Sequence, residues 1–299
     1  MQLPRCPSSI VVILTVAIVM SGYAQQSANA DWKPVEDALG RKGSVQPGDV
    51  YKFSMPRSDL KVTVAGTPIK AGLALGSWLA FKRMGNDAVV MGDLVLTESE
   101  VDPVMAKLQQ EGVGQTAVHN HLLNESPRVM YMHVAGRGDP VKLATALRDA
   151  LALTETPSVS PGPPAQQPNL GFDTSQVDKA LGHQGKNNNG IYQFSIARGE
   201  KINDMGMEIP PSMGTATAIN FQPTGTGRAA ITGDFVLIGR EVNPVIRALR
   251  DNGIMVTAVH SHMLTEEPRL FFMHFWANDD AVKLAKGLRA ALEKTNSAQ

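Results

Sequence analysis

The sequence predicts an α+β fold made of two homologous repeats, each a mainly antiparallel sheet with packed helices. One observation is a long internal repeat. TAVHNHLLNESPRVMYMHV at residues 116–134 returns as TAVHSHMLTEEPRLFFMHF at residues 257–275, an offset of 141 residues. A second is the order of elements, because each copy reads as helix, strands, helix, two strands and helix. Short connections between the strands favour hairpins, and amphipathic helices would cover one face of each sheet.

Changes in composition divide the chain into four segments. We expect a signal peptide over residues 1–30, a first repeat over residues 31–153, a linker over residues 154–170 and a second repeat over residues 171–299. The linker contains TETPSVSPGPPAQQPN, which is rich in proline and shows no apolar periodicity. The repeat length is far above that of solenoid proteins, so the pattern indicates a duplicated domain.

The first and last elements of each repeat follow from caps and apolar spacing. Residues 31–40 (DWKPVEDALG) and 172–182 (FDTSQVDKALG) read as short helices that end at a glycine. The closing helix of the first repeat begins at Asp139, an N-cap that is followed by proline at the first helical position. Apolar residues recur at helical spacing along this helix and its twin: Val141, Ala144, Leu147 and Leu151, then Val282, Ala285, Leu288 and Leu292.

Strands and a central helix are expected between these elements. Residues 50–55 (VYKFSM) alternate as a strand, and residues 76–82 and 89–96 are also strand-like. Ser99 and Asp102 form a capping-box pattern that predicts the start of the central helix. The helix then carries Val101, Val104, Met105 and Leu108 before a glycine stop at Gly112, and the second copy repeats this with Val242, Val245, Ile246 and Leu249 before Gly253.

The charge balance excludes two classes of partner. Lys and Arg number 28, Asp and Glu number 28, and no basic run interrupts the balance. Nucleic-acid binding and electrostatic docking to a membrane both normally need a basic excess. We therefore expect a partner that is neither nucleic acid nor a membrane surface, and an apolar content of 43% is that of an ordinary globular protein.

The N-terminus is typical of a secretory signal peptide. Arg5 precedes an eleven-residue apolar stretch at residues 10–20, which is too short to span a bilayer. Cleavage is expected after Ala24 or Ala30, which gives a secreted or periplasmic protein with no membrane anchor. The alternative is an uncleaved anchor. The only cysteine, Cys6, precedes the apolar stretch, so the mature chain has no thiol, and a metal would be held by histidine and carboxylate ligands.

Six of the seven histidines belong to the duplicated motif: His119, His121 and His133, then His260, His262 and His274. Residues i and i+2 of a strand point to the same face. A hairpin centred on Ser126 would place His119 opposite His133 and His121 opposite Tyr131, with cross-strand Cβ atoms about 4.5–5.5 Å apart. Each repeat is thus predicted to gather three imidazoles, which suit a divalent transition metal such as Zn²⁺.

Charged residues in the same turns extend this candidate site. Glu125 and Glu266 are candidate general bases, and Arg128 and Arg269 could bind a small anionic ligand in a bidentate manner. Two other readings of the histidines stay open, namely metal-free binding or acid–base residues, and hydrogen-bonded core residues.

Other recurring polar residues are interpreted as structural. Asp93 and Asp234 each follow a glycine and are interpreted as turn residues, with metal ligands as the less favoured alternative. The recurring pairs Arg57 with Asp59 and Arg198 with Glu200 are interpreted as surface ion pairs, which contribute little stability.

The repeated pattern G-D-[LF]-V-L, E-V-x-P-V, T-A-V-H-[NS]-H and P-R-x-x-[YF]-M-H resembles the LppY/LpqO-like family, a domain of unknown function in exported bacterial proteins. The resemblance covers both copies and implies export, but it assigns no catalytic residue. The namesakes are lipoproteins, whereas this chain has no cysteine after its apolar stretch. That difference favours a soluble exported protein.

Three functions are compatible with these residues. The first is an exported binding protein for a divalent metal or a small anionic ligand. The second is a metal-dependent hydrolase or isomerase in which Glu125 or Glu266 acts on a metal-bound water. The third is an envelope structural or interaction protein whose histidines are core. Retention of all three histidines in both copies and the absence of G-x-S-x-G or S-x-x-K nucleophile motifs favour the binding protein.

Overall fold

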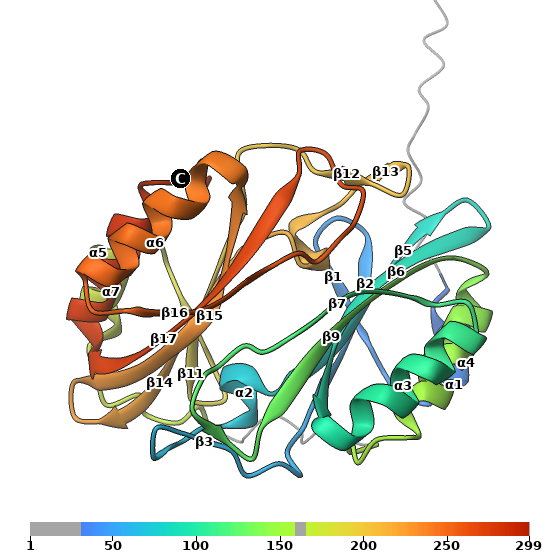
Figure 1. Ribbon diagram of the computed structural model, residues 1–299, viewed down its shortest axis with the longest axis horizontal. Coiled ribbons are helices and arrows are strands. Elements are labelled where there is room, and N and C mark those ends of the chain that lie inside the picture. Colours follow the sequence, from blue (N-terminus) through green and yellow to red (C-terminus); the bar gives the residue numbers. More distant parts are fainter. Residues whose placement is uncertain (1–30, 159–165, 299) are drawn as a thin grey trace, which may run out of the picture. The chain divides into compact units, whose positions relative to one another are not determined.

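The computed structural model describes residues 31–158 and 166–298, and both repeats lie within one compact unit that begins at Trp32 (Figure 1). The predicted signal peptide and its cleavage sites lie outside the described residues, as does part of the predicted linker. Among the residues described, no helix is both long and apolar enough to span a bilayer.

The first repeat is a six-stranded antiparallel sheet with three helices on one face. Its strand order is β1-β2-β5-β6-β9-β7. The strands are β1 (Ser44–Gln46), β2 (Val50–Pro56), β5 (Gly76–Met84), β6 (Asp87–Thr97), β7 (Gly114–His119) and β9 (Val129–Gly138). The covering helices are α1 (Lys33–Leu39), α3 (Glu98–Gln110) and α4 (Pro140–Leu151). A short helix α2 (Ala71–Ala74) and a small sheet of β3 (Thr63–Val64), β4 (Thr67–Pro68) and β8 (Glu125–Ser126) complete the repeat.

The second repeat has the same architecture, with strand order β10-β11-β14-β15-β17-β16. The strands are β10 (Lys186–Asn188), β11 (Ile191–Ile196), β14 (Thr217–Gly225), β15 (Arg228–Ile238), β16 (Met255–His260) and β17 (Leu270–Asp280). The helices are α5 (Thr174–Leu181), α6 (Val242–Asp251) and α7 (Ala281–Leu292). Short elements are β12 (Asn203–Asp204), β13 (Met207–Glu208), η1 (Pro211–Met213) and η2 (Gly239–Glu241). The predicted α+β class with two repeats is confirmed.

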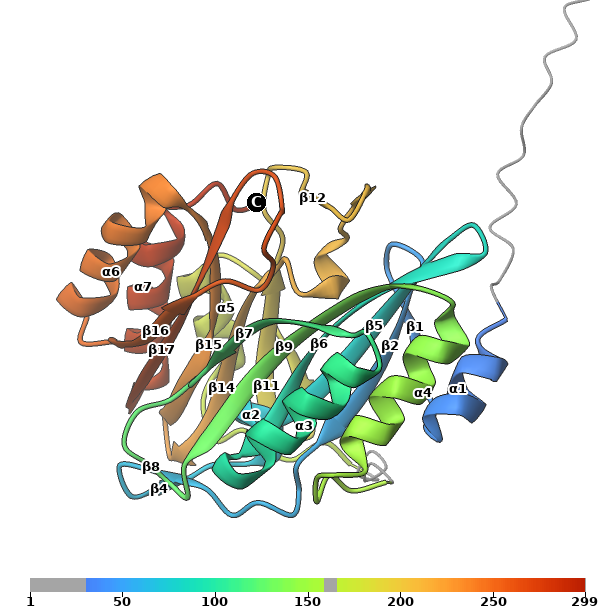
Figure 2. The same ribbon diagram turned by 45° about the vertical axis from the view of Figure 1, so that its right-hand side comes forward.

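The central strands of each sheet are buried on both faces. The helices cover the outer faces, and the inner faces lie toward each other between the repeats (Figures 1 and 2). One core cluster joins Val50 and Met91 of the first repeat to Met213 and Phe272 of the second. Strands buried on both sides read as continuous apolar runs rather than alternating ones, which accounts for sequences such as VVMGDLVL in β6. The inner faces are where the histidines lie.

The helix ends agree with the sequence, with one correction. Asp139 caps α4 by accepting from the backbone N–H groups of Val141 and Lys142. The central helix α3, however, begins at Glu98, because the backbone N–H of Thr97 donates to the Glu100 carboxylate at 2.8 Å. The predicted Ser99 cap is therefore wrong by two residues. A capping box that begins two residues earlier, with Thr97 at the N-cap and Glu100 three residues on, satisfies backbone N–H groups at the start of the helix.

Arg57 is not part of a surface ion pair, and neither is its counterpart Arg198. Arg57 is 0% exposed. Its guanidinium donates to Asp59, to Glu100 and to the Val95 carbonyl. A buried guanidinium requires such partners for its N–H groups. The arginine thus ties the end of β2 to β6 and to the first turn of α3.

The second repeat has the same buried network. Arg198 donates to Glu200, to Glu241 and to the Val236 carbonyl. The interpretation of both pairs as surface contacts failed because two neighbouring charges in a sequence do not reveal a third partner forty residues away.

We predict that Glu100→Ala destabilises the protein by about 3–5 kcal/mol, because it leaves the buried Arg57 charge without its second carboxylate. The measurement is the free energy of unfolding in urea. Glu111→Ala on the same helix removes the exposed Lys107–Glu111 pair and is expected to change that free energy by less than about 0.5 kcal/mol. Equal effects of the two substitutions would contradict the assignment.

Candidate functional site

The six motif histidines form one cluster between the two sheets, which we call the histidine cluster. His119 and His260 end β7 and β16, and their rings stack with centroids 3.6 Å apart. Equivalent contacts flank this pair, since His121 lies 3.8 Å from His274 and His133 lies 3.8 Å from His262 between ring centroids. Each close contact joins one repeat to the other.

The predicted hairpin register is wrong by two residues. Ala117, not His119, lies opposite His133, and His119 lies opposite Tyr131. The pairing of β7 with β9 is irregular between Gln115 and Ala117. Ser126, the predicted centre of the turn, lies in β8, which pairs with β3 outside the six-stranded sheet. A shift of two residues preserves the face on which each side chain lies. The histidines therefore still share one face.

The loops that carry His121 and His262 are held by matching contacts. The hydroxyl of Thr116 donates to the His262 carbonyl at 2.6 Å, and that of Thr257 donates to the His121 carbonyl at 2.5 Å. The His121 ring stacks on Tyr131 with centroids 3.3 Å apart, as the His262 ring stacks on Phe272 at 3.4 Å. Each repeat thus positions the second histidine of the other.

Asp93 and Asp234 are part of the cluster and are not turn residues. Each lies in the middle of a strand, directly opposite the third histidine of its repeat. An Asp234 carboxylate oxygen lies 2.9 Å from Nε2 of His262, and one of Asp93 lies 3.4 Å from Nε2 of His121. Sequence reasoning missed both. The usable signal was a charged residue retained in both copies inside an otherwise apolar run.

The glycine before each aspartate permits close strand packing. A Cβ atom at Gly233 would lie 2.0 Å from the Ala218 carbonyl oxygen of the neighbouring strand, and one at Gly92 would lie 2.6 Å from the Trp78 carbonyl oxygen. The glycines are therefore explained by the approach of the neighbouring backbone.

Ring nitrogens from both repeats come close enough to share a metal ion. One group contains His119, His260 and His274, and another contains His133, His260 and His262, with ligand atoms in each within 4.8 Å of one another. Neither group is the predicted trio of a single repeat. Nε2 of His119 lies 3.3 Å from Nε2 of His274. Two nitrogens bound to one tetrahedral zinc ion at about 2.0–2.1 Å would be separated by about 3.4 Å.

Several polar atoms of the cluster are buried and unpartnered. Within the described residues, the cluster atoms that find no hydrogen-bond partner are Asp93 Oδ1, His119 Nδ1, His121 Nε2, His133 Nε2, Asp234 Oδ1 and His260 Nε2. Each such atom in a protein interior costs about 1–3 kcal/mol. Their concentration in one place fits a site whose donor atoms serve a bound group.

Burial sets the protonation of the cluster. It lowers the pKa of His119, His121, His133 and His274 below the ordinary histidine value, and neighbouring histidines lower most of these further. Burial also raises the pKa of the Asp93 carboxyl. Neutral imidazole is the form that coordinates a metal, so burial favours that form in these four histidines.

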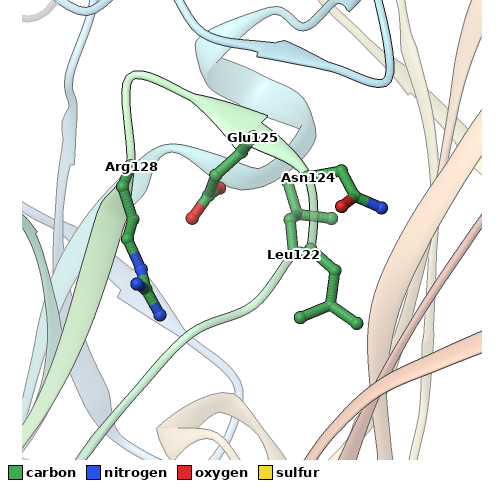
Figure 3. Close-up of a pocket in the computed structure, with 5 residues that line it drawn as sticks. Leu122, Asn124, Glu125 and Arg128 are labelled. Atoms are coloured by element: carbon green, nitrogen blue, oxygen red, sulfur yellow. The ribbon is translucent and has the colours of Figure 1, made fainter.

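The glutamates and arginines of the turns lie outside both metal-competent groups. Glu125 and Arg128 line a pocket of about 270 Å³ with Leu122, Leu123 and Asn124 (Figure 3). Burial raises the pKa of Glu125 to about 7.

Their counterparts in the second repeat bond to each other. Glu266 is 3% exposed and accepts from the Leu270 backbone N–H at 2.9 Å and from Arg269 at 3.2 Å. The glutamate and the arginine of this turn therefore bond to each other in the second repeat, whereas in the first repeat they line a pocket.

Comparisons with known proteins assign a family without a function. Residues 33–153 and 175–294 each match the family model described as Domain of Unknown Function (DUF1259). No curated protein matches the chain. Two solved structures are similar over 84% of this chain. A trimeric bacterial microcompartment shell protein PduB has 14% identity over 89% of its chain, and EtuB from Clostridium kluyveri has 9% over 90%, each with a TM-score of 0.21. These TM-scores are too low to bear on the site.

We predict that Gly233→Ala destabilises the protein by about 1–3 kcal/mol, because the new methyl group overlaps the Ala218 carbonyl and forces β14 and β15 apart. Urea unfolding measures the effect. Gly225→Ala in the same sheet is the matched control, since a Cβ atom there meets nothing within 4 Å. A Gly233→Ala protein as stable as the control would contradict the packing explanation.

Proposed function

The chain belongs to the family described as Domain of Unknown Function (DUF1259), with two copies of the domain, and on that premise we propose that it binds a divalent transition metal such as Zn²⁺ in the histidine cluster. The proposal is carried by the convergence of imidazole nitrogens from both repeats within 4.8 Å. Histidine nitrogens in this arrangement suit zinc and its neighbours in the transition series.

Backbone carbonyl groups support the metal proposal by orienting the rings of the second repeat. Nδ1 of His274 lies 2.7 Å from the Gly233 carbonyl oxygen, Nδ1 of His262 lies 3.2 Å from that of Gly214, and Nδ1 of His260 lies 3.2 Å from that of Ser261. A carbonyl oxygen can only accept, so these contacts favour the proton on Nδ1 and leave the Nε2 lone pairs of His260 and His274 free, whereas Nε2 of His262 also lies 2.9 Å from an Asp234 carboxylate oxygen. Metal-binding histidines are typically oriented in this way.

Binding is favoured over the two alternatives. A hydrolase or isomerase would need Glu125 or Glu266 beside a metal-bound water, and Glu266 already accepts from Arg269 and from the Leu270 backbone N–H. A purely structural role for the histidines leaves the unpartnered nitrogen and oxygen atoms of the cluster unexplained. A small anion could be attracted by Arg128, but it would lie at the turn and not in the cluster.

We extend the proposal to location and family. The apolar stretch at residues 10–20 and the small residues after it support export to the periplasm or the exterior. The LppY/LpqO-like motifs in both repeats support assignment to that exported family. The protein would then bind its metal ion outside the cytoplasm.

We predict that the full chain, purified without a histidine tag and reconstituted with Zn²⁺, retains stoichiometric metal after desalting, and that His260→Ala loses it. His260 is the test position because both metal-competent groups contain it. Elemental analysis by mass spectrometry measures the metal.

His183→Ala is the matched control, because His183 is the one histidine outside the duplicated motif. It is expected to retain the metal, and circular dichroism would verify that both variants fold. The proposal is wrong if reconstituted wild-type protein holds no metal, or if His260→Ala holds as much as wild type.

Chelation of the metal is expected to lower stability in one cooperative step. A ligand present at 100 times its Kd stabilises the folded state by about 2.7 kcal/mol. Because the ligand atoms come from both repeats, Zn²⁺ should raise a single Tm for the whole unit, by several degrees. Calorimetry with and without EDTA measures this. Separate transitions for the repeats, of which only one shifts, would contradict a shared site.

A further inference from the structure

We propose that the pocket between Glu125 and Arg128 is a second binding site, for a small α-amino carboxylate with an apolar side chain. The site lies in the first repeat alone and requires no metal.

The second repeat shows the turn in a closed form. Glu266 accepts from the Leu270 backbone N–H and from the Arg269 guanidinium, so both carboxylate oxygens are engaged. Arg269 also donates to the Met263 carbonyl and lies over the ring of Phe271. The glutamate and the arginine thus neutralise each other.

The first repeat shows the same turn in an open form. Glu125 keeps the backbone contact, accepting from the Val129 N–H at 3.1 Å. Its other oxygen is buried and finds no partner among residues 31–158 and 166–298. The Glu125 and Arg128 side chains extend into the same space, with Leu122 on its other side and the Asn124 side chain pointing away (Figure 3).

Two sequence differences accompany the open form, and one of them is Met130 in place of Phe271, whose ring lies beneath Arg269 in the closed form. Arg128 lies 3.8 Å from Glu98, at the start of α3, and both side chains are more than 60% exposed. The position that corresponds to Glu98 at the offset of 141 residues is Gly239. With no competing carboxylate, Arg269 turns to Glu266. Glu98 therefore offers Arg128 an exposed alternative partner to Glu125 that the second repeat lacks.

The pocket chemistry selects a zwitterion with an apolar side chain. Its volume is about 270 Å³, near the lower end of small-molecule sites. An ammonium group would donate to the Glu125 carboxylate, which lines the pocket, and a carboxylate would accept from the Arg128 guanidinium. The exposed contact between Arg128 and Glu98 is weak and easily displaced. Leu122 and Leu123 provide an apolar wall. Burial raises the pKa of Glu125 to about 7, although the nearby Arg128 charge acts in the opposite direction.

The test is isothermal titration of the full chain with L-leucine, with and without Zn²⁺. We expect saturable binding that is the same in both conditions, so a failure of the metal proposal would not mask it. Isocaproate, which lacks the ammonium group, and isoamylamine, which lacks the carboxylate, should each bind at least about tenfold more weakly, as for the loss of one charge-assisted hydrogen bond.

Matched variants locate the site. Glu125→Gln and Arg128→Gln should each weaken L-leucine binding at least about tenfold. Glu266→Gln and Arg269→Gln, the same changes in the closed turn, should leave it unchanged. Glu98→Gly, which copies the second repeat, should weaken binding as strongly as Glu125→Gln. The proposal is overturned if L-leucine shows no saturable binding, or if the second-repeat variants lose as much affinity as those of the first repeat.

Discussion

Burial of the two inner sheet faces against each other is the constraint on which the remaining features depend. An inner face that meets another sheet must be apolar or must satisfy its polar groups internally. Val50, Met91 and Phe272 meet the first requirement. The histidines and the two aspartates need the second, and they can meet it only at the centre, where β7 and β16 bring their ends together. Partly unsatisfied buried networks are costly, so a metal ion would resolve the same problem that the packing creates.

Duplication supplies the symmetry of the cluster, and later differences break it. Tyr131 stands where the second repeat has Phe272, and its hydroxyl is buried beside His121. Lys52 stands where the second repeat has Gln193, and burial lowers its pKa to about 8. Together with the change from Glu98 to Gly239, these differences give the first repeat more titratable side chains on the same backbone fold. The arginine networks under α3 and η2 remain the same in both, as expected of parts that hold the sheet and helix together.

Three errors in the sequence interpretation share one cause, which is dependence on distant partners. The aspartates looked like turn residues because a Gly-Asp pair favours turns locally, whereas the glycines are required by a neighbouring strand. Arg57 looked exposed because its adjacent acid, Asp59, was visible and its buried partner Glu100 was not. The hairpin register moved by two residues because β8 pairs with β3, a contact more than sixty residues away in sequence.

From its residues alone, the chain specified two α+β repeats, most helix ends and the gathering of three motif histidines on one side of each repeat, because caps and periodicity are local properties. The face survived the register error because side chains alternate with a period of two. Tertiary structure decided that the histidines of the two repeats meet in one cluster and that Asp93 and Asp234 join them. It also decided that one Glu–Arg turn is open while the other is closed. These outcomes depend on contacts between segments about 140 residues apart, and no local pattern encodes which nitrogen atoms will face each other.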